Sequence, residues 1–183
     1  KSTFDGLKMC FIGDGNNMAN SLIVGGLKVG MEVSIACPEG YHPDPQVLEF
    51  AKAYGDKFTL TDQPLEAAKD ADVVITDVWA SMGQEGEAEK RKVAFNGYQI
   101  NDDVMAQAHA DAMVLHCLPA HREEEITEKV FEAQMEGYPI SAETCGHYLT
   151  FVDQDTLDNG PMFKCAPPLR SEDAREGMWE YVE

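Results

Sequence analysis

Three apolar segments of the 183-residue chain run into polar, turn-forming residues. These residues are Gly-Asp-Gly-Asn-Asn at 13–17, Asp-Val-Trp-Ala-Ser-Met-Gly at 77–83 and His-Cys-Leu-Pro-Ala-His-Arg at 116–122. The carboxylate of Asp77 can pair with an ammonium group, and asparagine amides beside the free N–H groups of a helix start can hold a carboxylate. The three segments can therefore hold a carboxylate and an ammonium group of a ligand.

Each of these residues also has a purely structural interpretation. Asp77 can serve as a helix cap or a turn carboxylate, because aspartate is favoured at both positions. Cys117 can be a small buried thiol of a strand, which is a common environment for a free cysteine. Gly13 and Gly15 can simply make a tight turn between a strand and a helix. The sequence leaves these alternatives open.

Cofactor and metal chemistry have weaker support. A G-x-G pattern begins at Gly13, but Met18 occupies the third glycine position of a dinucleotide fingerprint, and no clear ribose-binding acid follows the second strand. His116 and Cys117 are neighbours on a strand and point to opposite faces, so they cannot form a protease dyad. No spacing of histidines or carboxylates is typical of a catalytic metal. We therefore expect neither a cofactor nor a metal.

Strand and helix signals alternate along most of the chain. Apolar, strand-like segments occupy 7–13, 31–38, 58–62, 71–79 and 112–119. Helix-like segments occupy 16–30, 44–55, 65–70 and 101–110, and the Gly/Glu-rich stretch after Ser81 turns helical toward Val93. Continuous apolar runs indicate strands buried on both faces. This order predicts an α/β fold of the Rossmann type, a doubly wound, mainly parallel sheet with helices on both faces.

Composition excludes several other classes of protein. The net charge of −19 would repel the phosphates of nucleic acid. No segment approaches the roughly 18 consecutive apolar residues that a membrane span needs. The five cysteines include no C-x-x-C pair and fit free thiols in a reducing cytosol better than a disulfide framework or a zinc site. We expect a cytoplasmic protein that binds neither nucleic acid nor membrane.

The three polar segments match one family in order and spacing. FIGDGNNMANSL, DVWASMGQE and HCLPAHR resemble the C-terminal, ornithine-binding domain of ornithine carbamoyltransferase, and the resemblance runs over about residues 1–132. That family transfers a carbamoyl group from carbamoyl phosphate to the side-chain amine of ornithine, giving citrulline and phosphate. The resemblance implies substrate-binding roles for Asn17, Asp77, Ser81 and Met82, and catalytic roles for Cys117 and Leu118.

The implied roles divide one ornithine molecule among the three segments. Asn17 would bind its α-carboxylate or α-amino end, and Asp77 would pair with its α-ammonium group. The Ser-Met-Gly loop would close on the ligand, and the Cys-Leu pair would lie against the reacting amine and the carbamoyl group. Little covalent work is needed, so holding an uncharged amine in line with the carbonyl would supply much of the catalysis.

Half of the family's two-substrate site is absent from these 183 residues. They contain no S-x-R-T-R segment, which holds the phosphate in the family's N-terminal domain, and the acidic stretch and C-terminal helix expected after Phe131 are also absent. We therefore expect the chain alone to be inactive, with weak ornithine binding. The alternative is a working carbamoyltransferase subunit, for ornithine or a related amine, that needs a separate phosphate-binding domain.

Residues from about 134 resemble a different family. MEGYPISAETCGHYLTF and FKCAPPLRSEDAREGMWEYV are similar to one βα unit in the TIM barrel of cyclic amidohydrolases, closest to allantoinase and dihydroorotase-like enzymes. The other metal-binding segments of that family are absent, so His147 is not expected to bind a metal. We expect a chimera, engineered or natural, of an ornithine-binding domain at 1–133 and a hydrolase-like fragment at 134–183.

The hydrolase-like fragment is expected to complete the same single domain. Pro139–Cys145 predicts a strand, within a stretch from Gly137 to Leu149, that extends the parallel sheet. Ser171 is expected to cap a helix whose apolar stripe holds Ala174, Met178, Trp179 and Val182. A remnant with amidohydrolase activity is the remaining alternative.

Overall fold

A computed structural model of the protein describes residues 3–80, 84–117, 120–133, 140–142, 146–163 and 168–179. The chain forms two compact units, Lys1–Ala142 and Glu143–Glu183. No helix in the described ranges combines the length and the apolar character that crossing a membrane would require.

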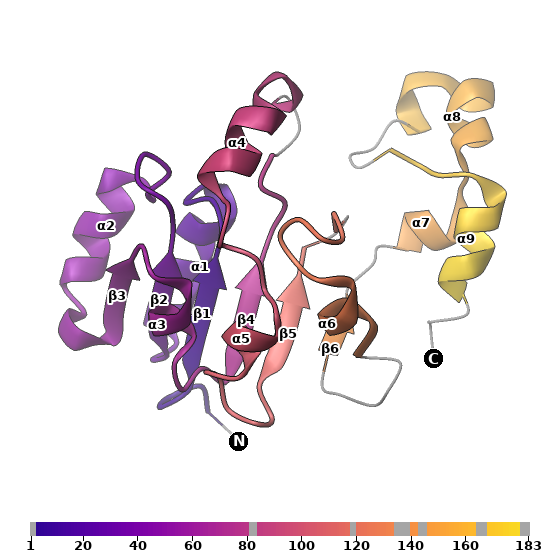
Figure 1. Ribbon diagram of the computed structural model, residues 1–183. Helices are drawn as coiled ribbons and strands as arrows, with labels where there is room; N and C mark the ends of the chain where they lie inside the picture. The colour runs from indigo at the N-terminus through magenta and orange to yellow at the C-terminus, as the bar shows by residue number, and fades with distance from the viewer. Residues whose placement is uncertain are drawn as a thin grey trace. The chain divides into compact units, whose positions relative to one another are not determined.

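The first unit is built on a parallel sheet of six strands (Figure 1). The strands are β1 (Lys8–Ile12), β2 (Glu32–Ala36), β3 (Phe58–Thr61), β4 (Val73–Thr76), β5 (Met113–His116) and β6 (Ile140–Ala142). Their spatial order is β3-β2-β1-β4-β5-β6, so the chain moves outward in one direction from β1 and then in the other from β4. This is the doubly wound arrangement that the alternating apolar runs predict.

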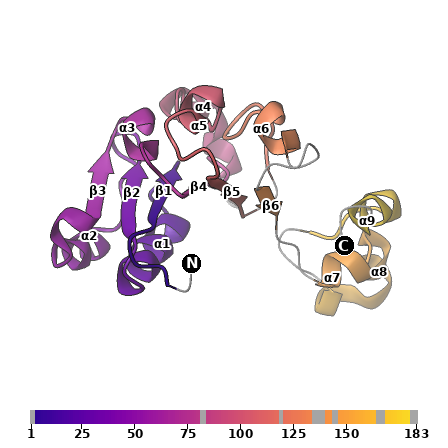
Figure 2. The same cartoon turned by 90° about the horizontal axis from the view of Figure 1, so that it is seen from below.

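Helices cover both faces of this sheet, with α1 and α2 on one side and α3 to α6 on the other (Figure 2). The helices are α1 (Asn17–Lys28), α2 (Pro45–Lys52), α3 (Pro64–Ala68), α4 (Ala88–Ala94), α5 (Asp102–Met105) and α6 (Glu128–Glu132). Short 3₁₀ turns, η1 (Gly55–Lys57) and η2 (Glu85–Glu87), precede β3 and α4. The Rossmann-type fold class is confirmed.

Successive residues of the central strand β1 pack into two separate cores, because side chains alternate across a strand. Met9 and Phe11 pack with the buried face of α1 and α2, whereas Cys10 and Ile12 pack with the buried residues of α3, α5 and α6. Helix α1 lies close against the sheet at Gly26, where a Cβ atom would lie 2.7 Å from Cε of Met9. Both faces of the central strand are therefore buried under helices.

The last strand of the sheet follows the end of α6 and an intervening stretch that the structure does not describe. β6 pairs with β5 in parallel, with Val114 opposite Ile140 and His116 opposite Ala142. It lies within the predicted strand at Pro139–Cys145, and the prediction that this segment extends the sheet is confirmed for those three residues.

The second unit is helical where it is described. It contains α7 (Gly146–Thr150), α8 (Asp153–Asn159), the 3₁₀ turn η4 (Gly160–Phe163) and α9 (Glu172–Trp179). Ser171 caps α9 as predicted, since its Oγ accepts the N–H of Ala174 at 3.4 Å. The residues that follow the predicted strand at Pro139–Cys145 form α7, where Thr150 Oγ1 donates to the carbonyl of Gly146 at 2.8 Å.

Candidate functional site

The carboxyl ends of β1, β4 and β5 lie side by side, where the strand order changes direction (Figure 1). The register pairs Phe11 with Ile75 and Ile75 with Leu115. Beyond these pairs, Thr76 donates a hydrogen bond from Oγ1 to the carbonyl of Ile12 at 2.7 Å. Open α/β sheets bind ligands at such a point, because the neighbouring connections leave in opposite directions and a crevice opens between them. The fold thus brings together the three strand ends from which the polar segments begin.

The two asparagines at the start of α1 have different environments. Asn16 caps the helix, because its Oδ1 accepts the N–H of Met18 at 3.0 Å. Asn17 is the first helical residue and is exposed. Gly15 precedes both, where a Cβ atom would lie 2.3 Å from the backbone nitrogen of Pro43, so only glycine lets the two loops come so close. Asn17 is therefore the asparagine positioned to meet a ligand at the helix start.

Asp77 follows β4 directly and is half-buried. Burial raises the pKa of Asp77, the Val78 hydrogen bond and nearby His116 lower it, and the carboxylates of Glu125 and Asp14 raise it. That hydrogen bond runs from the N–H of Val78 to Oδ1 at 2.8 Å and is a turn contact of a structural aspartate. Since a carboxylate can accept several hydrogen bonds, the structural and ligand-binding interpretations are compatible.

His116 and Cys117 occupy different environments at the end of β5. Cys117 is exposed, and its Sγ lies 3.9 Å from the carbonyl oxygen of Thr76 on the neighbouring strand. His116 is buried, with Nε2 3.0 Å from Oε1 of Glu125. The same oxygen accepts the backbone N–H of His121, so Glu125 holds the loop after β5 against the strand. The contacts of Glu125 thus hold the backbone on both sides of Cys117, whose thiol is exposed at the strand end.

An arginine that the sequence did not single out reaches this site from α4. Nη1 of Arg91 lies 2.6 Å from Oδ2 of Asp14 and donates to the carbonyl of Trp79 at 2.9 Å. Arg91 and Asp14 are both buried. In the sequence, Arg91 is one charge within a charged helix, a pattern that normally indicates a solvated face, and only the fold shows that it points inward.

The loop after β5 also gathers potential metal ligands that the sequence analysis did not connect. One ligand atom from each of His121, Glu124 and Glu125 lies within 4.8 Å of the others. Glu124 pairs with Lys92 at 2.9 Å, and Glu125 accepts the N–H of His121. Because both carboxylates already have cationic or N–H partners, we assign no metal to this cluster.

Three predicted site residues, Ser81, Met82 and Leu118, lie outside the described residues. The structure places Asn17 at the start of α1, Asp77 directly after β4 and Cys117 directly after β5, at one edge of the sheet. The binding and catalytic roles of all six residues stay predictions. A separate cavity of about 420 Å³ is lined by Asn101, Asp102, Asp103, Glu123, Thr127 and Lys129. None of the predicted site residues lines this cavity, so the cavity is not part of the predicted ornithine site.

Most of the chain matches a known family of domains. The family described as aspartate/ornithine carbamoyltransferase, Asp/Orn binding domain, matches residues 5–143. The chain belongs to this family. The matched range contains all six described strands and the three polar segments at their ends.

Ornithine carbamoyltransferases are among the similar proteins. The enzyme of Geobacter metallireducens is 56% identical over 133 residues, and that of Methanosarcina mazei is 53% identical over 132 residues. Each alignment covers 72% of this chain but 44% of the relative. The structure of ornithine carbamoyltransferase from Pyrococcus furiosus aligns with a TM-score of 0.68 and 46% identity, covering 76% of this chain and 45% of that one. The matched part of the chain thus spans less than half the length of these carbamoyltransferases.

The family match ends near the boundary between the two compact units, since it reaches residue 143 and the first unit ends at Ala142. The carbamoyltransferase resemblance is confirmed for the first unit. The resemblance of the later residues to cyclic amidohydrolases, and their origin in a TIM barrel, stay predictions.

Proposed function

We propose that the first unit binds ornithine as the carbamoyl acceptor at the carboxyl ends of β1, β4 and β5. The observation that carries this proposal is the convergence of Asn17, Asp77 and Cys117 at the point where the strand order changes direction, within a domain of this family. An exposed amide at a helix start, a partly desolvated carboxylate and an exposed thiol are three different groups, and ornithine offers three ends to match them.

The geometry supports a specific orientation of the ligand. The α-carboxylate of ornithine lies by Asn17, where the N-terminus of the 12-residue helix α1 adds a favourable partial positive charge. The α-ammonium group pairs with Asp77, and the side-chain amine lies toward Cys117 at the end of β5. The Ser-Met-Gly loop and Leu118 complete the site in this proposal. The reaction then depends mainly on holding the amine in line with the carbamoyl carbon.

Carbamoyl transfer needs a second binding site, for carbamoyl phosphate, that these 183 residues do not supply. The relatives described above are more than twice as long as their aligned parts, and this chain contains no S-x-R-T-R segment. We therefore propose that the chain by itself binds ornithine weakly and does not form citrulline at an enzyme-like rate. A phosphate-binding domain, on a separate chain or in a longer form of this protein, would supply the missing half.

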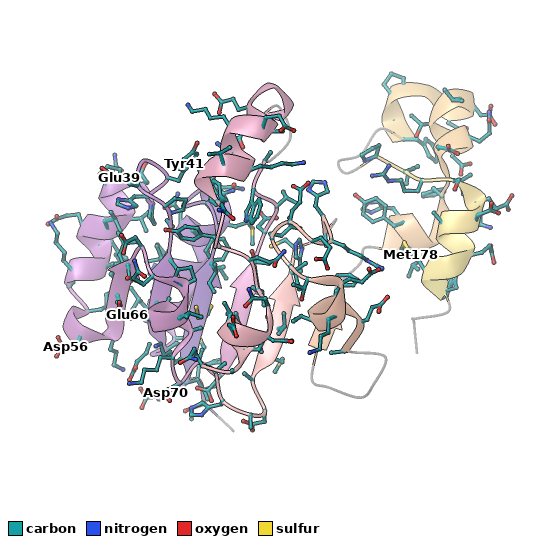
Figure 3. The ribbon with its side chains drawn as sticks, viewed as in Figure 1. Glu39, Tyr41, Asp56, Glu66, Asp70 and Met178 are labelled. Atoms are coloured by element: carbon teal, nitrogen blue, oxygen red, sulfur yellow. The ribbon has the colours of Figure 1, made fainter. Side chains whose placement is uncertain are left out.

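Calorimetric titration of the chain with ornithine tests the acceptor site. We expect saturable binding to the wild-type chain and at least about tenfold weaker binding to Asp77→Asn, because a pair with a charged group contributes on the order of 1.5–3 kcal/mol. Asp56→Asn is the matched control, since Asp56 is an exposed aspartate in η1 before β3. Figure 3 labels Asp56 far from the carboxyl ends of the strands.

Two results would contradict the acceptor site. One is wild-type chain that shows no ornithine binding at millimolar concentrations. The other is Asp77→Asn binding ornithine as tightly as the wild type does. Adding a phosphate-binding carbamoyltransferase domain and measuring citrulline then separates the two forms of the proposal, because a gain in turnover favours a working subunit and no gain favours a domain that only binds.

We also propose that the residues after the first unit have a different origin, in a cyclic amidohydrolase-like protein. This proposal rests on the resemblance of MEGYPISAETCGHYLTF and FKCAPPLRSEDAREGMWEYV to that family. The carbamoyltransferase family match extends past the expected boundary at 134, to residue 143. Hydrolase activity is not part of this proposal. Metal analysis of the purified chain tests the remnant alternative, which requires bound zinc in stoichiometric amount.

A further inference from the structure

The geometry points to Arg91 as a positioning residue that joins the loops after β1 and β4 into one ornithine site. This inference rests on the proposed function, because its consequence is measured on ornithine binding. Arg91 belongs to α4, which follows both loops in the sequence, and its side chain is buried, with the residue 6% exposed. A charged side chain that is so deeply buried must have partners to offset its desolvation.

The partners of Arg91 come from two different loops. Its Nη1 lies 2.6 Å from Oδ2 of Asp14, which is in the loop between β1 and α1, three positions before Asn17. The same nitrogen donates to the carbonyl oxygen of Trp79 at 2.9 Å. Trp79 is two positions after Asp77 and two before Ser81 in the sequence. One guanidinium nitrogen therefore links the two segments that carry the proposed ligands of both charged groups of the amino acid.

The guanidinium also packs on an aromatic ring, while its Nε makes no hydrogen bond within the described part of the chain and lies 3.7 Å from Oε2 of Glu87. Its central carbon lies 5.0 Å from the ring centroid of Tyr41, which is in the loop after β2 and close to the base of α4 (Figure 3). The Tyr41 ring packs edge-on against Phe95 at 4.8 Å between centroids, and Phe95 stacks on Trp79 at 5.9 Å. A cation over an aromatic face in a desolvated site is a favourable contact. Arg91 thus sits in a packed aromatic setting that fixes its direction.

Arg91 also affects the balance of charge between Asp14 and Asp77. Asp14 is one of the charges that raise the pKa of Asp77, so the two carboxylates repel each other. Arg91 neutralises Asp14 at 2.6 Å and leaves Asp77 as the carboxylate next to the α-ammonium group. A partner shared by the two loops fixes the spacing of their ligands, and such spacing strongly affects binding and rate.

Lysine cannot replace this arginine fully. A guanidinium is planar and presents several N–H donors in a fixed geometry, whereas an ammonium is a point charge on a flexible stem. We therefore expect Arg91→Lys to keep the charge balance with Asp14 but to lose part of the link to Trp79. Ornithine affinity should fall by about threefold to tenfold in this variant.

A single and a double variant separate the effect of Arg91 on stability from its effect on ornithine binding. Arg91→Met leaves Asp14 buried without its partner and should lower the melting temperature strongly. Combining Arg91→Met with Asp14→Asn removes both charges and should recover most of that loss. Ornithine affinity should stay at least about tenfold below wild type in the double variant, because the link between the loops is still missing. Affinity that recovers together with the melting temperature would overturn the inference.

Hydrogen exchange on the free chain provides a readout that does not depend on ornithine. In the double variant, the amides of Gly15–Asn17 and of Val78–Trp79 should both exchange at least about tenfold faster than in wild type. Faster exchange in neither segment, or in only one, would overturn the inference even if the wild-type chain bound no ornithine and the proposed function failed. Arg175→Met is the matched control, since Arg175 also pairs with carboxylates, those of the exposed Glu172 and Glu176 in α9, but lies outside the proposed site.

Discussion

At the scale of single residues, the charge of Asp77 lowers the stability of the folded chain and is needed to bind an ammonium group. Burial raises the pKa of Asp77, so its charged form is disfavoured in the folded chain relative to the unfolded chain. The folded state then binds its proton more readily, and the free energy of unfolding falls as pH rises through the raised pKa. A residue kept only for the turn contact with Val78 would not need a charge, because asparagine can accept the same hydrogen bond.

The first prediction follows from this decrease in the free energy of unfolding with rising pH. Asp77→Asn should raise the melting temperature near about pH 7, and the gain should shrink to nothing below the ordinary pKa of aspartate, near about pH 3. Thermal unfolding of both proteins across this pH range measures the difference. Ornithine affinity of the wild type should change in the opposite direction and increase as pH rises, since the carboxylate is the form that pairs with ammonium. A melting temperature that falls in Asp77→Asn at neutral pH would contradict the first part.

The second prediction concerns the cysteines. Burial raises the pKa of Cys10 and that of Cys37 to about 12, whereas Cys117 is exposed. The thiolate is the reactive form, so iodoacetamide at about pH 8 should alkylate Cys117 at least about 100-fold faster than the two buried thiols. Mass spectrometry of peptides from the native chain measures each rate, in a background where Cys145 and Cys165 are changed to serine. Saturating ornithine should slow the reaction at Cys117, and equal labelling of all three thiols would contradict the assignment of burial.

At the scale of elements, neighbouring glycines of α1 have opposite roles. A Cβ atom at Gly26 would lie 2.7 Å from Cε of Met9 and 2.8 Å from Cγ2 of Val33, whereas a Cβ atom at Gly25 has no atom within 4 Å. Gly26 therefore allows α1 to pack closely on β1 and β2. Gly25 has no such function in the packing and only lowers the helix propensity.

The third prediction uses this matched pair. Gly25→Ala should stabilise the chain by about 0.5–1 kcal/mol, because alanine loses less backbone freedom in a helix. Gly26→Ala should destabilise it by about 1–3 kcal/mol, since the branched Val33 cannot move away as easily as the Met9 methyl can. Urea unfolding of the two variants measures both changes. Two alanine variants of equal stability would show that α1 does not approach the sheet as closely as described.

The strands and their ends could be predicted from the sequence because buried parallel strands are continuous apolar runs. The predicted 7–13 contains β1, and the predicted 31–38 contains β2. The partners of Arg91 could not be predicted, because they come from loops that are separated in the sequence and meet only in the fold. Helix α8 could not be predicted, because Leu157 is the one apolar residue among its seven and no apolar stripe marks the helix.

At the scale of the whole molecule, the two units differ in how much apolar surface they bury. Buried hydrophobic side chains in the described part of the second unit are limited to Leu169, whereas Leu157 is 78% exposed and Met162 is 92% exposed. The first unit has a core on each face of its sheet. Units of about 40 residues rarely fold alone without disulfides, metals or partners. The second unit should therefore contribute little to the stability of the first.

The fourth prediction compares two truncations that differ by one strand. Residues 1–142 keep β6 and should unfold cooperatively, with a melting temperature within about 3 °C of the full chain, because each core of the first unit is retained. Residues 1–133 lack β6 and leave the edge of β5 unpaired, so their melting temperature should fall by several degrees. Circular dichroism during heating measures both transitions. The ornithine affinity of residues 1–142 should equal that of the full chain, since Asn17, Asp77, Arg91 and Cys117 all precede the cut. Loss of cooperative unfolding in residues 1–142 would mean that the helices of 146–179 complete the fold of the carbamoyltransferase domain rather than follow it.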